Sequence, residues 1–330
     1  MSRIVRFHKT GGPEVLEIEN LDLGAPGPGD VQIRVHALGL NRAESMFRSG
    51  AYLETATFPS QIGYEAAGEI EAIGPGVKGL SVGDAVSTIP AFSMSRYGVY
   101  GDTAIVPANV VAKHPSHLSW SEAAAIWMQY LTAYGALVDL TTINAGDAVI
   151  IPAASSSVGL AAIQIVNLLG GISIAATRTS AKRADLLKAG AQHVIVTSEQ
   201  DLAQEVMTIT AGRGAKVSFD PVAGPGLNDL AAAAADEGII FIYGALSPEP
   251  TPYPLFPALA KNLTVRAYTL WSVTRRPDLM EKATKFIVDH LASGALKPVI
   301  AKTFPLEQIV EAHRYLESNQ QFGKIIVTVR

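Results

Sequence analysis

The 330-residue chain contains no cysteine. This absence excludes disulfide bonds and every metal site that is built on thiolate ligands. No apolar run approaches the length of a membrane-spanning helix, about 18 uninterrupted residues, and the opening stretch MSRIVRFHKTGGPEVLEI lacks the apolar run of a signal peptide. We therefore expect a cytoplasmic protein that does not enter a membrane.

An excess of either charge is lacking as well. The chain has 26 basic and 30 acidic residues, a net charge of -4 and no clustered Lys/Arg face. No nucleic acid or anionic membrane is expected as a partner, because both attract a basic surface. With 48% hydrophobic and 17% charged residues, the composition is typical of a soluble globular protein, and we expect a small-molecule substrate.

The length of the chain predicts two domains. Between residues 148 and 268, short apolar runs alternate with helical patterns, which is typical of a parallel sheet with crossover helices. Six strand-like runs with this rhythm predict an α/β fold with a doubly wound, Rossmann-type sheet. The runs are AVIIP, ISIAAT, HVIV, KVSFD, IIFIYG and LTVRAY.

The part of the chain before this sheet has a different pattern. It holds short β-type runs separated by Gly, Pro and Asp turns, which indicates an irregular, mainly β domain. The closing run GKIIVTVR needs a sheet to join, and the β domain is the favoured host. We expect a catalytic domain of residues 1–124 completed by residues 270–330, and a dinucleotide-binding domain of residues 125–269.

The turn after the first of the six strands reads AASSSVG. Unsatisfied backbone N–H groups and the helix dipole make such a turn an anion site, and a serine is tolerated there wherever φ is negative. The position of the turn predicts a phosphate loop, although a plain strand-to-helix turn with a serine cap has the same pattern. The predicted loop residues are Ser155, Ser156, Ser157, Val158 and Gly159.

The end of the second strand indicates which nucleotide fits. An acid there would bind the ribose 2′-hydroxyl of NAD, but the segment IAATRTSAKRAD has none before Asp185. Basic and hydroxyl side chains gather there instead and suit the 2′-phosphate of NADPH, while a solvated helix start is the alternative interpretation. These residues are Arg178, Ser180, Lys182 and Arg183.

Seven motifs follow one another along the chain: GLNRAESMFRSGAY, IGYEAAGEIEAIGPGVKGLSVGDAV, LTAYGAL, AASSSVG, LLKAGAQHVI, FDPVAG and FGKIIV. In this order and at this spacing, the chain resembles the medium-chain dehydrogenase/reductase superfamily, and within it the zinc-free quinone oxidoreductase-like branch. The resemblance implies a mainly β, GroES-like catalytic domain formed by both ends of the chain, with a Rossmann domain between them.

The resemblance also bears on a metal. The zinc branch of the superfamily holds its metal with a Cys in the segment here reading GLN and a His in the segment here reading GYE. This chain has Asn41 and Tyr64 at those places. Glu65 alone cannot make a site, because catalytic zinc takes about three protein ligands. We therefore expect no metal.

Four catalytic-site residues are implied by the resemblance. Asn41 and Thr132 would lie by the nicotinamide, Tyr52 would line the substrate site, and Tyr64 could donate its hydroxyl to substrate. The alternatives are a turn Asn, buried structural tyrosines and a helix-interior hydroxyl. Arg183 falls where the family commonly carries a phosphate-contacting Lys. The other implied cofactor contacts are Asn41, Thr132, Thr177, Val222, Tyr243, Gly244 and Lys324.

Without a metal to polarise a ketone, a quinone or an α,β-unsaturated carbonyl is the suitable hydride acceptor, because it needs only modest help from hydrogen bonds. The predicted function is therefore an NADPH-dependent, zinc-independent reductase of such acceptors. The alternatives are an enoyl-thioester reductase of the same superfamily and a non-catalytic NADPH-binding protein. The family often forms homodimers, and LTVRAY, last in the predicted sheet, is an edge in need of cover.

Overall fold

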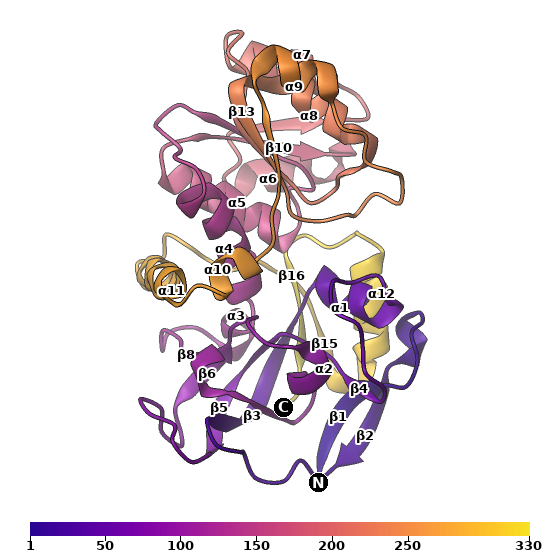
Figure 1. Cartoon of the computed structure of the whole chain (residues 1–330), viewed down its shortest axis with the longest axis vertical. Helices are drawn as coiled ribbons and strands as arrows, with labels where there is room; N and C mark the ends of the chain where they lie inside the picture. The colour runs from indigo at the N-terminus through magenta and orange to yellow at the C-terminus, as the bar shows by residue number, and fades with distance from the viewer. The chain divides into compact units, whose positions relative to one another are not determined.

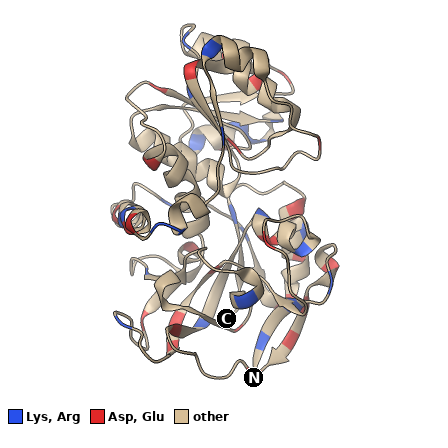
Figure 2. Cartoon of the chain, viewed as in Figure 1, with Lys and Arg blue, Asp and Glu red and all other residues tan.

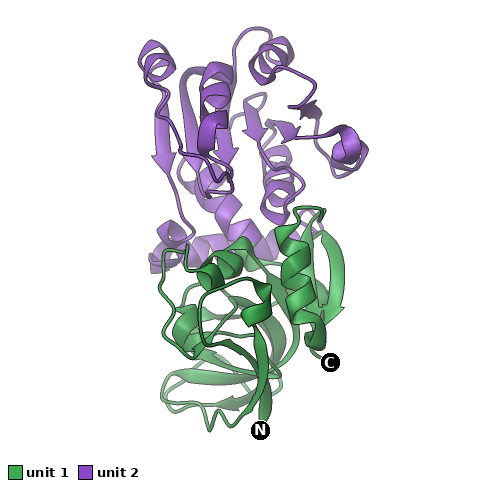
Figure 3. Cartoon of the chain, turned by 90° about the vertical axis from the view of Figure 1, so that its right-hand side faces the viewer, with its two compact units in different colours: residues 1–128, 298–330 green, residues 129–297 purple.

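The computed structural model describes residues 1–330, which form two compact units (Figure 3). Unit 1 comprises residues 1–128 and 298–330, and unit 2 comprises residues 129–297. Each unit has its own main sheet and its own hydrophobic core. Each therefore has the anatomy of a folding domain of ordinary size.

Unit 2 is built on a six-stranded sheet in which all neighbouring strands are parallel. The order across the sheet is β11-β10-β9-β12-β13-β14, so the direction of winding reverses between β9 and β12. Doubly wound sheets bind ligands at the carboxyl ends of the strands at such a reversal. The strands are β9 (Ala148–Ile151), β10 (Ile172–Thr177), β11 (His193–Val196), β12 (Ala215–Asp220), β13 (Ala234–Ile242) and β14 (Thr264–Ala267).

Helices cross between the strands of unit 2. The most apolar of them, α5 (Ser157–Leu168), joins β9 to β10 and buries most of its residues, as expected of a helix that packs on the face of a parallel sheet. The others are α4 (Trp127–Tyr134), the π-helical turn η3 (Gly135–Asp139), η4 (Ser180–Lys182), α6 (Arg183–Lys188), α7 (Leu202–Ile209), η5 (Gly224–Gly226), α8 (Leu227–Ala233), α9 (Leu255–Lys261), α10 (Trp271–Thr274) and α11 (Pro277–Ala292).

Unit 1 holds a seven-stranded sheet and a three-stranded sheet of order β2-β1-β4. The larger sheet has the order β15-β16-β3-β5-β6-β8, with β7 also paired to β3, and only its β15 and β16 are parallel. The strands are β1 (Ser2–Phe7), β2 (Glu17–Leu21), β3 (Asp30–Leu40), β4 (Ser60–Gln61), β5 (Glu65–Ile73), β6 (Ala85–Thr88), β7 (Thr103–Pro107), β8 (Val111–Lys113), β15 (Ile300–Pro305) and β16 (Lys324–Thr328).

The closing strand β16 joins unit 1, as the sequence predicts. It pairs antiparallel with β3, with Ile325 opposite Leu40. Of the helices in this unit, α1 and α12 lie side by side (Figure 1). The helices are α1 (Arg42–Ser49), α2 (Met94–Tyr97), α3 (Trp120–Ala123) and α12 (Ile309–Glu317), with short 3-10 turns η1 (Pro13–Val15), η2 (Ala108–Val110) and η6 (Leu306–Gln308).

The predicted fold class, a doubly wound sheet domain plus a mainly β GroES-like domain, is confirmed, and each of the six predicted strand runs forms a strand of the parallel sheet. The compact units differ from the expected boundaries at residues 125–128, which belong to unit 1, and at residues 270–297, which belong to unit 2. The physical reason is local packing: Phe286 of α11 lies 5.2 Å from the ring of Tyr134, and Arg276 forms an ion pair with Asp139.

Basic and acidic residues are interspersed over both units (Figure 2). The interspersion agrees with the small net charge of -4. No helix of the chain is both long and apolar enough to cross a membrane.

Candidate cofactor and active site

The turn between β9 and α5 is a helix N-terminus whose first amides are already partly capped. Ser156 is the N-cap of α5, and its Oγ accepts a hydrogen bond from the backbone N–H of Gly159 at 3.1 Å. Its φ of -70° lies in the ordinary extended region, where a serine fits without strain. The one positive φ of the turn, 47°, falls on Ala153. Serines at 156 and 157 therefore cause no backbone strain.

Close backbone packing requires a glycine at position 159. A Cβ at this position would lie 2.6 Å from the carbonyl oxygen of Ala154 and 2.7 Å from its Cα. The first turn of α5 therefore packs on the end of β9 at a distance that only glycine permits. This close packing points the free amides of the helix at the space beyond the strand, where an anion would bind.

A cation from the next crossover reaches this turn. The Nζ of Lys182, at the end of η4, donates to Ser155 Oγ at 3.1 Å. Burial and the nearby Arg178 guanidinium both lower the pKa of Lys182, which places the two positive charges close together. Of the other predicted contacts here, Thr177 is half-buried, whereas Ser180 and Arg183 are exposed at the start of the helical segment.

The carboxyl ends of β12 and β13 complete this edge of unit 2. The buried Asp220 accepts hydrogen bonds from the amides of Val222 and Ala223 at 2.8 and 2.9 Å, so it fixes the turn that carries Val222. Tyr243 stacks on Phe219, with ring centroids 4.1 Å apart. Its hydroxyl is buried and lies close to the side chain of Ser156.

These two groups of residues lie at one place in the sheet. Because β9 and β12 are neighbours at the reversal of winding, the serine turn after β9 and the Asp220 turn after β12 leave the same edge. Gly244 follows β13 along that edge, and a Cβ there would lie 2.6 Å from the carbonyl oxygen of Pro221. The structure thus brings the serine turn, the Asp220 turn and Gly244 to one edge of the unit 2 sheet.

In unit 1, Asn41 begins α1 and shares a capping box with Glu44. The Asn41 amide N–H donates to Glu44 Oε2 at 2.6 Å, and the Asn41 Nδ2 donates to Glu44 Oε1 at 3.1 Å. Glu44 Oε1 also accepts the backbone N–H of Tyr64 at 3.2 Å. Burial raises the pKa of Glu44 to about 7, against the opposing effect of the Lys324 ammonium.

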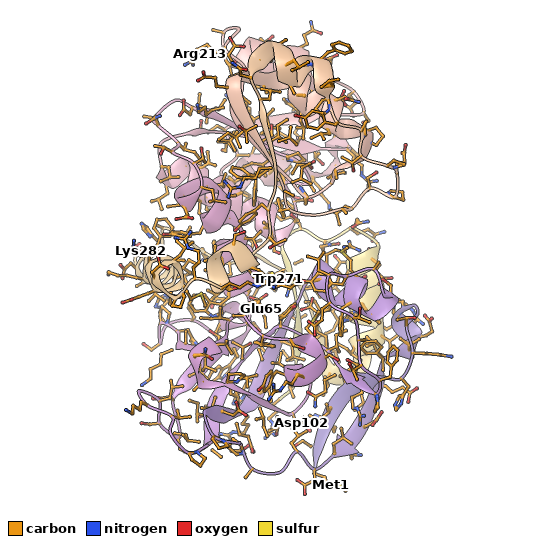
Figure 4. The ribbon with its side chains drawn as sticks, in the orientation of Figure 1. Met1, Glu65, Asp102, Arg213, Trp271 and Lys282 are labelled. Atoms are coloured by element: carbon orange, nitrogen blue, oxygen red, sulfur yellow. The ribbon has the colours of Figure 1, made fainter.

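Lys324 supplies a buried cation to the same cluster. Its Nζ donates to Asn41 Oδ1 at 2.5 Å and forms an ion pair with Glu65, and neither side chain of the pair reaches solvent. Glu65 in turn accepts the Asn41 Nδ2 at 3.1 Å and the backbone N–H of Met128 at 3.0 Å. Figure 4 labels Glu65 within unit 1.

This arrangement changes what Asn41 and Lys324 are able to do. The Asn41 Oδ1 is engaged by Lys324, and its Nδ2 is shared among three acceptors: Glu44, Glu65 and the carbonyl of Gly39. The Lys324 side chain, expected at the cofactor, lies in the interior of unit 1 because its charge is held by Glu65. Both residues are thus bound within this cluster, and their contact with the cofactor stays a prediction.

Aromatic side chains surround Tyr64 in unit 1. Its ring centroid lies 6.5 Å from that of Tyr52 and 5.6 Å from that of Phe92, which in turn contacts Tyr97. Burial raises the pKa of Tyr64 well above its usual range, and its hydroxyl has no partner within hydrogen-bond geometry. A buried, protonated phenol of this kind is able to donate to an oxygen placed against it.

Thr132 lies in unit 2, buried on α4.

The sequence pattern did not lead to two residues of these sites. Glu44 is one, although N-R-A-E is a capping-box pattern that could have indicated it. Asp220 is the second, and an acid at the end of the fourth strand of the sheet is its only sequence signal. Lys182 is one of the four residues predicted for the 2′-phosphate, and its Nζ donates to Ser155.

Comparison with known proteins agrees with this architecture. A family model described as alcohol dehydrogenase GroES-like domain matches residues 27–116, and one described as zinc-binding dehydrogenase matches residues 189–327. Quinone oxidoreductase 1 of Escherichia coli strain K12 is 31% identical over 331 residues, with 99% of each chain covered. The 2-haloacrylate reductase of a Burkholderia species is 30% identical over 327 residues, with 97% of each covered.

The chain belongs to the medium-chain dehydrogenase/reductase superfamily, in its quinone oxidoreductase-like branch. Two solved structures cover it completely, each with a TM-score of 0.92. One, at 29% identity, is an Escherichia coli quinone oxidoreductase complexed with NADPH, and the other, at 31%, is described as an NAD-dependent alcohol dehydrogenase. The predicted family is thereby confirmed.

The residues at the family's catalytic-zinc positions do not fit the zinc ion that the second family model names. The ligand positions hold Asn41 and Tyr64, an amide and a phenol. The Glu65 carboxylate is already paired with the Lys324 ammonium. Catalytic zinc needs about three nitrogen, sulfur or carboxylate ligands that are free to bind it. In this quinone oxidoreductase-like protein, the Lys324 ammonium neutralises Glu65, the carboxylate next to these ligand positions.

Proposed function

We propose that this protein is an NADPH-dependent reductase that delivers hydride to a quinone or an α,β-unsaturated carbonyl. The observation that carries the proposal is the edge of the unit 2 sheet, where Lys182 and Arg178 stand beside a serine-capped helix N-terminus and no acid follows β10. Bound NADPH supplies the hydride. The relatives named quinone oxidoreductase and 2-haloacrylate reductase support this choice of acceptor class.

In this proposal unit 2 binds and orients the nucleotide. The amides at the start of α5 hold the pyrophosphate, because the first turn of a helix presents unsatisfied N–H groups to an anion, and Ser155, Ser157, Val158 and Gly159 are proposed contacts from the same turn. Lys182 and Arg178 hold the 2′-phosphate by charge-assisted hydrogen bonds. Thr132, Thr177, Ser180, Arg183, Val222, Tyr243 and Gly244 are kept as proposed contacts.

Unit 1 would serve the acceptor. Tyr52, Phe92 and Tyr97 give an aromatic wall of inclined rings, which suits a quinone or enone. The Tyr64 hydroxyl would donate to the acceptor oxygen, where negative charge develops as hydride is added. The Asn41, Glu44, Glu65 and Lys324 cluster holds the backbone of Tyr64 in place, through the hydrogen bond from its N–H to Glu44.

A turnover screen tests the proposal as a whole. NADPH oxidation is measured with quinones, enones, enoyl-CoA thioesters and simple aldehydes, and we expect quinones or enones to give the highest kcat/KM. A clear preference for enoyl-CoA would identify the enoyl-thioester reductase. Binding of NADPH without oxidation by any acceptor would identify a non-catalytic NADPH-binding protein.

Replacing Tyr64 by Phe tests the proposed oxygen contact. We expect kcat/KM for the best acceptor to fall by about 100-fold, the usual cost of losing one donor to a developing oxyanion, with NADPH affinity unchanged. Tyr100→Phe is the matched control, because Tyr100 is also buried in unit 1 and its hydroxyl also lacks a partner. Equal rates for the parent and Tyr64→Phe would make Tyr64 a structural residue.

Replacing Ser156 by Gly tests the serine turn. The Ser156 Oγ occupies the Gly159 amide, which a phosphate would otherwise bind, so its removal should tighten NADPH binding by up to about threefold. The loss of the cap costs α5 only a few tenths of a kcal/mol when the replacement is glycine. Isothermal titration with NADPH measures the change. A tenfold loss of affinity would show instead that the hydroxyl itself binds phosphate.

The chain is also proposed to form a homodimer through the β14 side of unit 2. β14 is an edge strand, and the neighbouring α9 exposes Phe256 at 81% and Leu259 at 67% of their surfaces. Phe256→Glu with Leu259→Glu should shift the mass measured by light scattering from dimer to monomer. Leu53→Glu, an equally exposed apolar position in unit 1, is the control. A parent chain that is already monomeric would end this proposal.

A further inference from the structure

The surface of unit 1 carries an open pocket of about 570 Å³, called the cavity below, that plays no part in the proposed reaction. None of its lining side chains is apolar. The lining comprises Thr10, Gly11, Gly12, Arg42, Ser45, Arg48, Ser49 and Glu317. A quinone or enone site needs apolar walls, so this cavity is suited to a different kind of ligand.

The cavity lies along one face of α1. Positions 42, 45, 48 and 49 recur at helical spacing and therefore face the same side. Glu317 comes from the last residue of α12, the helix beside α1 in Figure 1, and Thr10 comes from the turn that precedes η1. Three separate parts of unit 1 thus supply the walls.

Arg42 is held in the wall with donors to spare. Its Nη2 donates to the carbonyl of Leu316 at 3.0 Å and to the side chain of Asn319. Its Nε and Nη1 have no partner within the chain. An arginine that is fixed through one nitrogen is able to donate two hydrogen bonds from Nε and Nη1 to an oxyanion.

Arg48 adds a second guanidinium, and this one is fully enclosed. Its side chain is 1% exposed, with Nη1 bound to the carbonyl of Gly11 and Nη2 to Glu317. Its Nε is buried without any hydrogen-bond partner. Because this N–H is closed to solvent, Arg48 supplies positive charge to the wall of the cavity and no free donor.

The charges of the lining favour an anion. Two guanidinium groups face one carboxylate, that of Glu317, and Ser45 Oγ donates to the same carboxylate at 2.7 Å. Glu14 also acts on Arg48 but lies outside the lining, with its carboxylate on the amide of Gly12. The hydroxyls of Thr10 and Ser49 offer further donors. We propose that this cavity binds an oxyanion of the phosphate class.

Calorimetric titration of the full chain with inorganic phosphate at low ionic strength tests the proposal. The unit 2 turn could also bind phosphate, so the titration is made in the Lys182→Ala, Arg178→Ala background, which keeps the unit 1 cavity intact. We expect saturable binding that Arg42→Met weakens at least tenfold. Arg314→Met, an exposed arginine on α12 that does not line the cavity, should leave it unchanged.

A second variant guards against misfolding of the first. Ser49→Asp places a carboxylate at an exposed lining position and should abolish phosphate binding. Coenzyme A, titrated in parallel, separates the two sources of phosphate: affinity at least tenfold above that of phosphate indicates a phosphate group on a larger ligand, and equal affinity indicates free phosphate. No binding by the parent, or binding that survives both Arg42→Met and Ser49→Asp, would overturn the proposal, whatever the turnover screen shows.

Discussion

Replacing Lys324 by Met should destabilise unit 1 by about 3 to 5 kcal/mol, the usual cost of removing one partner of a buried ion pair. The physical reason is that Glu65 would remain enclosed with its charge uncompensated, beside the second buried carboxylate of Glu44. The Asn41 Oδ1 would lose its 2.5 Å hydrogen bond at the same time. The midpoint of urea unfolding measures the change.

Tryptophan fluorescence reports this unfolding for unit 1 alone if Trp271 is replaced by Phe. The two remaining tryptophans, Trp120 and Trp127, both lie in unit 1, and Trp127 is buried with its Nε1 bonded to Ser87. The double variant Lys324→Met, Glu65→Gln is the control and should recover most of the loss, because it removes the unpaired charge. Equal instability of the single and double variants would contradict the assignment of the cost to that charge.

Removing Lys182 and Arg178 together should abolish the preference for NADPH over NADH. Each charge-assisted hydrogen bond to the 2′-phosphate contributes about 1.5 to 3 kcal/mol, so the affinity for NADPH should fall by about 100-fold or more. The affinity for NADH should change by less than about threefold, apart from any loosening of the Ser155 contact. Fluorescence titration with each nucleotide measures both.

The matched control for this experiment is Lys188→Ala. Lys188 is an exposed cation at the end of α6 and should leave the nucleotide preference unchanged. Arg183→Ala should weaken NADPH binding less than Lys182→Ala does, because the Arg183 side chain is exposed. A larger effect of Arg183→Ala than of Lys182→Ala would make Arg183 the main contact of the 2′-phosphate, and equal losses for NADPH and NADH would remove the assignment from this whole segment.

The sheet of unit 2 could be predicted because its signals are local. Each strand is a short apolar run, and each crossover has the spacing of a helix, so the six strands follow from neighbouring residues alone. The choice between Lys182 and Arg183 does not follow, because successive residues of a helical turn differ by about 100° in direction. Only the folded turn determines which of the two reaches Ser155.

The cluster of unit 1 was beyond sequence analysis for another reason. Lys324 and Asn41 are 283 positions apart, and they meet because β16 pairs with β3 in a register that places Ile325 opposite Leu40. A shift of that register by one residue would turn Lys324 to the other face of the sheet. The backbone angles of the serine turn could not be predicted from the sequence either, and they determine whether the backbone at Ser156 is strained.

The position of Lys324 also constrains the order of events during synthesis. The cation that completes the unit 1 cluster follows the whole of residues 129–297 in the chain, and so does the strand that carries it. Domains generally fold as units while the chain emerges, and unit 2 is continuous in sequence. Unit 2 is therefore able to fold on the ribosome before Lys324, the counter-charge of Glu44 and Glu65, has been synthesised. Unit 1 is complete only after residues 298–330 have been synthesised.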